Sequence, residues 1–261
     1  MRYAFKVQYI GKNYSGSQLQ LGQNLPTIQE ELEKALCTLI KPKNCDLDAD
    51  LAKKHNDNRP IKAIFSGRTD SGVNSLGQVV HFDVDKPIVA SKFMYQINEI
   101  LPDDISVSDL KEVKPEFHAQ KSAKSRHYVY EFVNRKCKNA FDGDLMRVKY
   151  DVDISKMQKA LDYLKGEHDF SSFKSSGTLN PSKVCIIYEA KVSKVGDKVI
   201  IDIVGNRFLY NMVRAIVGTL LEIEGHNLPA EHMKDVLEAK DRTKAGQNVS
   251  PYGLTLVEVT Y

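Results

Sequence analysis

The sequence predicts an α+β fold made of two ferredoxin-like halves, each with its elements in the order β-α-β-β-α-β. Segments that alternate apolar and polar residues, as strands do, are interleaved with segments of helical period. The same order of elements occurs twice in 261 residues, with the halves at residues 1–114 and 115–261. Two open sheets of this kind can join side by side, so we expect the halves to be joined through their sheets around a central cleft.

In the first half, the predicted helix at 27–40 has the clearest start signal. Thr27 stands at its N-cap position and Glu30 follows three residues later, which is the capping-box pattern. A polar run at 48–60 indicates an exposed loop. The strands of this half are predicted at 2–9, 61–65, 78–84 and 105–113, and its second helix at 91–101.

The second half repeats the pattern with one additional helix. Two of its strands are separated by Gly196 and Asp197, which predicts a hairpin turn. The helix at 207–223 carries a clear apolar face, as expected of a helix packed on a sheet. The strands of this half are predicted at 126–133, 184–195, 198–205 and 253–261, and the other helices at 153–166 and 229–240.

Composition narrows the class of protein. Hydrophobic residues make up 42% of the chain, and no run of about 18 apolar residues predicts a transmembrane helix. The first residues, MRYAFKVQYIGKNYSG, do not form a signal-peptide pattern. The cysteines show no C-x-x-C spacing, which argues against a zinc site and a disulfide framework and predicts a reducing, cytoplasmic location. They are Cys37, Cys45, Cys137 and Cys185.

The net charge of +3 is unevenly distributed. Residues 111–150 contain ten Lys or Arg and five Asp or Glu, a local charge of +5. A basic segment on a nearly neutral protein favours a polyanionic partner, although a solvated lysine-rich face has the same composition. The histidines show no metal-ligand spacing, so no metal site is predicted.

The segment FSGRTDSGVNSLGQVVHFD, residues 65–83, places Arg68 and Asp70 in a glycine-rich loop before an apolar strand. Glycines let a loop turn sharply or approach a ligand closely. The segment lacks the G-K-[ST] ending of a phosphate-binding loop. An Asp beside Gly can also simply form an Asx-turn or a helix cap. Asp70 is therefore a candidate catalytic carboxylate with an ordinary structural alternative.

Arg214 lies at the border of the apolar face of the predicted helix 207–223. Apolar neighbours on both sides make it partly buried, and a partly buried guanidinium needs an acceptor. Asp70 is one candidate partner, and such a pair would keep the carboxylate ionised. The alternative is a surface arginine whose aliphatic part packs on the helix while its charge reaches water.

The segment FHAQKSAKSRHYVYEF, residues 117–132, combines aromatic side chains with positive charge. In its predicted strand, Arg126, Tyr128 and Tyr130 point to the same side. Aromatic rings beside cations on a sheet suit base stacking and phosphate contacts. The two tyrosines can equally be ordinary core residues, so this pattern indicates an RNA-binding surface without requiring one.

Taken together, these stretches resemble the bacterial TruA-type tRNA pseudouridine synthases. The resemblance runs from residue 3 to residue 261 in seven blocks that keep the family's order, which makes it far more specific than any single block. The blocks are YSGSQLQ (14–20), SGRTDSGVNSLGQVVHF (66–82), LPDDISV (101–107), FHAQKSAKSRHYVYEF (117–132), HDFSSFKSSG (168–177), GNRFLYNMVRAIVG (205–218) and GLTLVEVTY (253–261).

The resemblance implies an isomerase that converts uridine to pseudouridine at positions 38, 39 and 40 of the tRNA anticodon stem-loop. It implies no cofactor, a homodimer and a basic, RNA-binding cleft between the halves. The family's catalytic aspartate falls on Asp70, its active-site tyrosine on Tyr128, and the arginine that pairs with the aspartate on Arg214. Arg68 matches the loop arginine that helps to extrude the target nucleotide. The expected phosphate contacts are Lys121, Lys124 and Arg126.

Some positions depart from the family pattern without touching Asp70, Tyr128 or Arg214. They affect expected RNA contacts, and residues 48–60 resemble an insertion. The substituted positions are Ile10, Lys12, Ser66, Ser71, Asn74 and Gln120. The sequence leaves two other functions open: a non-catalytic RNA chaperone, for which Asp70 is dispensable, and a nucleoside hydrolase, which needs a second carboxylate that no matched block supplies.

Overall fold

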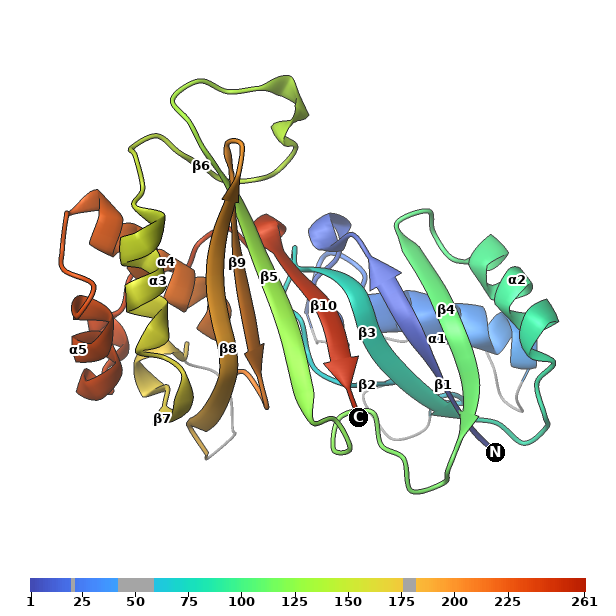
Figure 1. The fold of residues 1–261 in the computed structure, drawn as a ribbon. Helices are drawn as coiled ribbons and strands as arrows, with labels where there is room; N and C mark the ends of the chain where they lie inside the picture. Colours follow the sequence, from blue (N-terminus) through green and yellow to red (C-terminus); the bar gives the residue numbers. More distant parts are fainter. Residues whose placement is uncertain (20–21, 42–58, 176–181) are drawn as a thin grey trace. The chain divides into compact units, whose positions relative to one another are not determined.

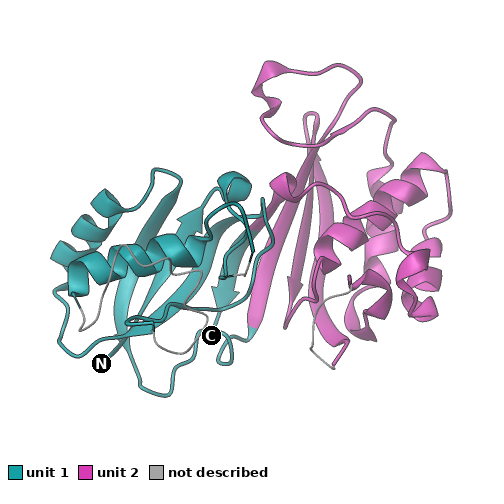
Figure 2. Ribbon diagram, turned by 180° about the vertical axis from the view of Figure 1, so that it is seen from behind, with its two compact units in different colours: residues 1–124, 256–261 teal, residues 125–255 magenta. Residues whose placement is uncertain are grey.

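The computed structural model describes residues 1–19, 22–41, 59–175 and 182–261. The expected loop at 48–60 lies outside this description except for its last two residues. Contacts divide the chain into two compact units, shown in different colours in Figure 2. Unit 1 comprises residues 1–124 and 256–261, and unit 2 comprises residues 125–255.

Unit 1 contains a sheet with the strand order β4-β1-β3-β10, in which β1 runs antiparallel to both β4 and β3, and the short strand β2 also pairs antiparallel with β3. Because β1 and β2 both pair with β3, the segment β1-α1-β2 is a split β-α-β unit, which is the ferredoxin-like arrangement predicted for the first half. The strands are β1 (Arg2–Tyr9), β2 (Ile64–Phe65), β3 (Asn74–Asp83), β4 (Ile105–Val113) and β10 (Leu254–Thr260).

The helices α1 (Ile28–Ile40) and α2 (Ala90–Ile100) pack on one face of this sheet (Figure 1). The alternating inward residues of β1 contact apolar side chains of both helices in a single buried cluster. The predicted capping box is present: the Thr27 side chain accepts from the backbone N–H of Glu30, and the Glu30 carboxylate accepts from the backbone N–H of Thr27. Local sequence and tertiary packing therefore agree at the start of α1.

Unit 2 contains a sheet with the strand order β5-β9-β8-β7, in which β6 pairs in parallel with β5. The predicted hairpin of β8 and β9 is confirmed, with Gly196 in the left-handed region at its turn. The strands are β5 (Ser125–Asn134), β6 (Arg147–Val148), β7 (Gly166–Asp169), β8 (Val184–Val195) and β9 (Lys198–Gly205). The helices are α3 (Ile154–Asp162), α4 (Met212–Gly225) and α5 (His232–Ala239).

The two units do not divide the chain at the expected 114/115 boundary. Residues 115–124 and 256–261 both belong to unit 1. Within that unit, the Tyr261 hydroxyl donates to the Ala119 carbonyl over 2.8 Å, and the Lys124 N–H donates to the Thr260 carbonyl over 2.8 Å. The end of the predicted strand 253–261 therefore completes unit 1, whereas the sequence pattern had placed it in the second half.

Helix α4 begins five residues later than the sequence predicts. Residues 207–211 precede the helix, and Asn211 at its N-cap has φ +61° and ψ +9°. A left-handed residue cannot continue a right-handed helix, so the apolar period of 207–223 extends past the helix start. No helix in the described ranges is long and apolar enough to cross a membrane.

Candidate active site

Asp70 lies in unit 1, in the loop between β2 and β3. The base of this loop is fastened to β3: the Ser66 N–H donates to the Val79 carbonyl over 2.8 Å, and the Gln78 amide donates to the Gly67 carbonyl over 2.8 Å. The Ser66 hydroxyl also hydrogen-bonds the Gln78 side chain. The start of the loop is thus held by buried polar contacts.

Thr69, between Arg68 and Asp70, is buried and anchors the centre of the loop. Its N–H donates to the Ser17 hydroxyl over 2.8 Å, and its carbonyl accepts from the Ser17 N–H over 3.1 Å. Its hydroxyl lies 2.8 Å from the hydroxyl of Tyr9 on β1. On either side, Arg68 is exposed and Asp70 is half-buried. The buried contacts of Thr69 therefore fix the loop, while its neighbours Arg68 and Asp70 keep access to the surface of unit 1.

The segment before α1 fits against this loop only because Gly16 has no side chain. Gly16 has φ +108°, and a Cβ there would lie 2.7 Å from the Thr69 carbonyl oxygen. The loop then turns at Gly72, which has φ +80°, and the Val73 N–H donates to the Asp70 carbonyl over 3.1 Å. The matched segments 14–20 and 66–82 are thus two parts of one local structure.

Lys121 and Lys124 are exposed on the segment that links β4 to β5. This segment is attached to β3 through His81, whose Nδ1 accepts from the Ala119 N–H over 3.1 Å. Burial, followed by the nearby charges of Arg2 and His118, lowers the pKa of His81 to about 4. Neutral His81 is therefore a structural acceptor for the segment that carries the two lysines.

Acidification from pH 7 to pH 5 is expected to destabilise unit 1 through His81. The unfolded imidazole has a pKa of about 6.5, so the unfolded chain binds the proton more readily than the folded chain, and this stability is lost as pH falls from about 6.5 towards 4. The loss is about 2 kcal/mol between pH 7 and pH 5. Urea unfolding of the wild type and of His81→Gln, which keeps an acceptor but does not titrate, measures it. Equal pH dependence in the two proteins would contradict the assignment.

In unit 2, Tyr128 lies on β5 with its ring edge-to-face with Phe208, at a centroid distance of 5.0 Å. Tyr128 is 9% exposed, whereas Tyr130 is 0% exposed and donates from its hydroxyl to the Ser250 carbonyl over 2.9 Å. Burial raises the pKa of Tyr130, which keeps it neutral. Both tyrosines are therefore buried, Tyr130 completely and Tyr128 with a small part of its side chain accessible.

Arg126 is half-buried and donates from Nη1 to the Asn206 carbonyl over 2.7 Å. Asn206 in turn connects to β8, because its Oδ1 accepts from the Ile186 N–H over 2.9 Å. This contact braces the strand end where Tyr128 lies. Arg126 thus has a structural contact in addition to the phosphate contact that the resemblance implies.

Arg214 lies in the first turn of α4 and is half-buried, as the sequence predicts. Its Nε donates to the Val249 carbonyl over 2.8 Å, and its Nη1 donates to Oδ1 of Asn211 over 2.9 Å. The positive end of the helix dipole lies at the same place, so the local field favours an anion. Asp70 belongs to unit 1 and Arg214 to unit 2, and their pairing stays a prediction.

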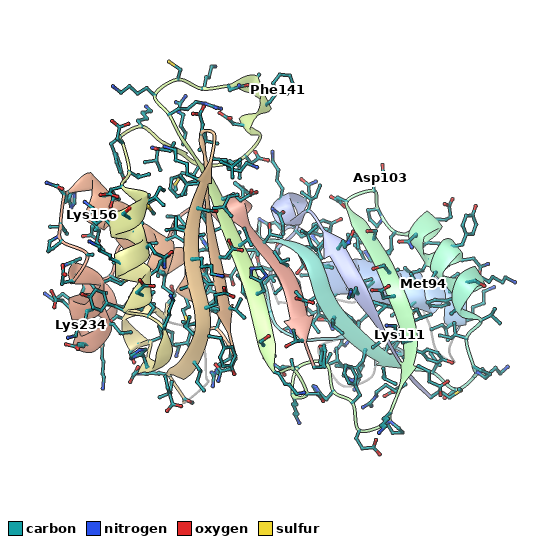
Figure 3. All side chains as sticks on the ribbon, viewed as in Figure 1. Met94, Asp103, Lys111, Phe141, Lys156 and Lys234 are labelled. Atoms are coloured by element: carbon teal, nitrogen blue, oxygen red, sulfur yellow. The ribbon has the colours of Figure 1, made fainter. Side chains whose placement is uncertain are left out.

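The basic segment 111–150 is shared between the units. Residues 111–124 carry four Lys and two Glu in unit 1, and residues 125–150 carry six Lys or Arg and three Asp or Glu in unit 2. Figure 3 shows Lys111 on β4, whereas Phe141 marks the loop that follows β5. The charge of this segment is therefore +2 in the part that belongs to unit 1 and +3 in the part that belongs to unit 2.

The residues that hold the candidates in place carry no recognisable signal in the sequence. Thr69, Ser17 and Tyr9 support the Asp70 loop, and Asn211 and Val249 hold Arg214. Asn211 lies inside the helix that the sequence predicts at 207–223, so its position gave no signal of this role, and nothing marked Val249. Among the described residues, no cluster of His, Cys, Asp or Glu could hold a metal ion.

Comparison with known proteins gives a consistent family assignment. A family model described as tRNA pseudouridine synthase matches residues 160–261. The chain is 39% identical over 260 residues to tRNA pseudouridine synthase A of Thermoanaerobacter sp. (strain X514), covering 98% of this chain and 97% of that protein. The protein of the same name from Bacillus licheniformis is 39% identical, covering 100% and 99%, and that from Colwellia psychrerythraea is 37% identical, covering 100% and 94%. With such similarity over its whole length, the chain belongs to the tRNA pseudouridine synthase family, whose members isomerise uridine to pseudouridine in tRNA.

Proposed function

We propose that the chain forms pseudouridine at positions 38, 39 and 40 of the tRNA anticodon stem-loop, with Asp70 as its catalytic nucleophile. The observation that carries this proposal is the anchoring of Thr69, which is buried and bonded on three sides. Its neighbours Arg68 and Asp70 are kept at the surface of unit 1 in a defined orientation. A carboxylate held this way can act on a nucleotide that has left the base stack.

The reaction breaks the N1–C1′ bond of uridine, rotates the uracil and joins C5 to C1′. In one route, a carboxylate oxygen of Asp70 attacks C1′ as uracil leaves through N1, and C5 of the rotated base then displaces the carboxylate. The C5 proton is finally lost to a base, and N1, no longer bonded to C1′, takes up a proton. Removal of a sugar proton to give a glycal and addition to C6 of uracil are alternative first steps. All three routes require an ionised, oriented Asp70.

Arg214 and Tyr128 act on the same nucleotide in this proposal. Arg214 pairs with Asp70 and keeps it ionised, which is supported by the anion-favouring position of the guanidinium at the start of α4. Tyr128 stacks on the uracil while it rotates and assists the removal of the C5 proton. The edge-to-face contact with Phe208 holds the Tyr128 ring in a fixed orientation, which supports this role.

The RNA is bound through cations of both units. Arg68 inserts into the stem-loop and supports the extruded nucleotide, and Lys121, Lys124 and Arg126 contact backbone phosphates. The exposure of Arg68, Lys121 and Lys124 supports these roles. Because each phosphate contact releases a counterion, tRNA affinity falls as the salt concentration rises.

The proposal also includes a cytoplasmic homodimer that needs no cofactor. Scattered cysteines suit a reducing compartment, and Cys37, Cys137 and Cys185 are free thiols. The carboxylate route above balances without a metal or a redox partner. Sedimentation of the purified chain tests the dimer, since a species of one chain mass across the working concentration range would exclude it.

Tritium release from tRNA tests the site of modification. Transcripts carrying uridine tritiated at C5 at only one of positions 38, 39 or 40 are expected to lose their label to water, because joining C5 to C1′ expels that hydrogen. A transcript labelled only at a uridine outside the anticodon stem-loop is the matched control. Release from the control alone would move the target elsewhere in the tRNA, and no release from any tRNA by folded protein would favour the chaperone alternative.

A further inference from the structure

The start of α4 breaks a local rule of helix formation. An Asn at an N-cap position normally has extended backbone angles, and its side chain accepts from a backbone N–H of the first turn. Asn211 instead has φ +61°, and its side chain caps no backbone N–H. Asn tolerates the left-handed region better than most residues, which explains the residue type without explaining the conformation. Departures of this kind are common where a residue serves a site.

The Asn211 side chain is used on Arg214. Its Oδ1 accepts from Nη1 of Arg214 over 2.9 Å, and its Nδ2 donates to the hydroxyl of Ser175 over 3.1 Å. Since a guanidinium only donates, the Asn oxygen must face Arg214 and its nitrogen must face Ser175. The amide can satisfy both contacts only in this orientation, so Ser175 fixes the position of the acceptor.

A second anchor holds another atom of the same guanidinium. Nε of Arg214 donates to the Val249 carbonyl over 2.8 Å. Two contacts on Nε and Nη1 define the plane of a rigid guanidinium, which also sets the direction in which Nη2 points. The anchors are linked, because the Asn248 amide donates to the same Ser175 hydroxyl over 3.2 Å. The Arg242 guanidinium donates to Oδ1 of Asn248 over 2.9 Å and fixes that amide in turn.

We propose that Asn211 is a positioning residue for the isomerisation: held by Ser175, it aims the Arg214 guanidinium at the carboxylate that Arg214 serves. This inference rests on the proposed function, in which Arg214 supports Asp70. The left-handed backbone of Asn211 brings its amide beside Arg214 instead of beneath the helix start. The Asn211 side chain thus holds the Arg214 guanidinium instead of capping the first turn of α4.

Two substitutions of Asn211 separate its backbone role from its side-chain role. Asn211→Gly keeps the left-handed conformation without strain and removes both side-chain contacts. Asn211→Asp keeps the shape and the tolerance for positive φ but places a carboxylate against Nη1 of Arg214. This second carboxylate competes for the guanidinium, so Asp70 loses part of its support and titrates at a higher pH.

We expect Asn211→Gly to lower kcat for tRNA by about 10- to 100-fold, because a small misplacement of a catalytic group has effects of this size. KM should change less than threefold and the melting temperature by only a few degrees. Asn211→Asp should lower kcat similarly and move the acidic limb of the pH profile of kcat/KM to higher pH. Tyr130 is a titratable group that feels the charge of Arg214, and burial raises its pKa, so it stays neutral through this pH range.

Unchanged kcat in both variants would overturn the inference, as would a loss of activity that only follows the loss of folded protein. A rise in KM alone would also overturn it and would make Arg214 a phosphate contact. Arg214→Gln, measured in parallel, separates the two proposals. If Arg214→Gln is inactive while Asn211→Gly is fully active, only the positioning role fails. If Arg214→Gln is fully active, both the proposed role of Arg214 and the positioning role fail.

Discussion

Asp70→Asn is expected to abolish pseudouridine formation, with tritium release from C5-labelled tRNA falling on the order of 10⁴-fold or more, as for the removal of other catalytic nucleophiles. The amide has the size of the carboxylate but cannot attack C1′ or accept a sugar proton efficiently. The loop should keep its structure, because the hydrogen bonds of Thr69 to Ser17 and of Gly67 to Gln78 are unchanged by the substitution. The melting temperature and tRNA affinity should therefore change little.

Asp103→Asn is a matched control for this experiment. Asp103, labelled in Figure 3, is an exposed carboxylate of the same unit, so the substitution removes the same charge from a position outside residues 65–83. Wild-type release is expected from this variant. Release by folded Asp70→Asn at the wild-type rate would leave the reaction in place and remove Asp70 from its assigned role. Equal loss in both variants would indicate an effect of net charge on tRNA binding.

Gly218→Ala is expected to destabilise unit 2 by about 3 kcal/mol or more, a large effect for one methyl group. Gly218 lies in the middle of α4, where Ala is normally favoured over Gly by about 1 kcal/mol. Here the added Cβ would lie 1.8 Å from the Gln247 carbonyl oxygen, and backbone cannot move aside as a side chain can. The cost of this clash therefore exceeds the gain in helix propensity, and the substitution lowers the free energy of unfolding.

Urea unfolding of Gly218→Ala beside Gly225→Ala measures this effect. Gly225 ends the same helix, and a Cβ there meets the ring of Tyr150 at 3.3 Å, which a side chain can accommodate. The control should change stability by less than about 1 kcal/mol. Gly218→Ala should also lower kcat under conditions where it is folded, because it displaces the segment whose Val249 carbonyl holds Arg214. Similar stability of the two variants would show that the segment moves away at little cost.

The elements of the first half could be predicted from the sequence because their signals are local. The capping box at Thr27 and the alternation in β1 each depend on residues a few positions apart. The partner of the last strand could not be predicted, since a period of two shows which residues face inward and not which strand lies alongside. Only contacts such as that of Tyr261 with Ala119 assign residues 256–261 to unit 1.

For the candidate site too, some residues could be predicted from the sequence and others could not. Residue types and motif order singled out Asp70, Tyr128 and Arg214, because chemistry restricts which side chains can serve. The residues that fix them could not be found, since Thr69 and Asn211 are selected by contacts distant in the chain. The start of α4 could not be predicted for the same reason. The conformation of Asn211 allows its hydrogen bonds with Arg214 and Ser175, and the helical period of the sequence does not indicate either contact.

The membership of residues 256–261 in unit 1 has a consequence for the order in which the chain folds as it leaves the ribosome. Every residue of unit 2 is synthesised before these six, so unit 2 has its full set of residues while unit 1 still lacks a strand beside β3. Unit 1 is thus the first unit whose synthesis begins and the last whose residues are all present. Until then the edge of β3 stays open, and an open strand edge is a site for mispairing with other nascent chains. An early stop within the last strand would thus leave the unit that carries Asp70 without the strand that pairs with β3.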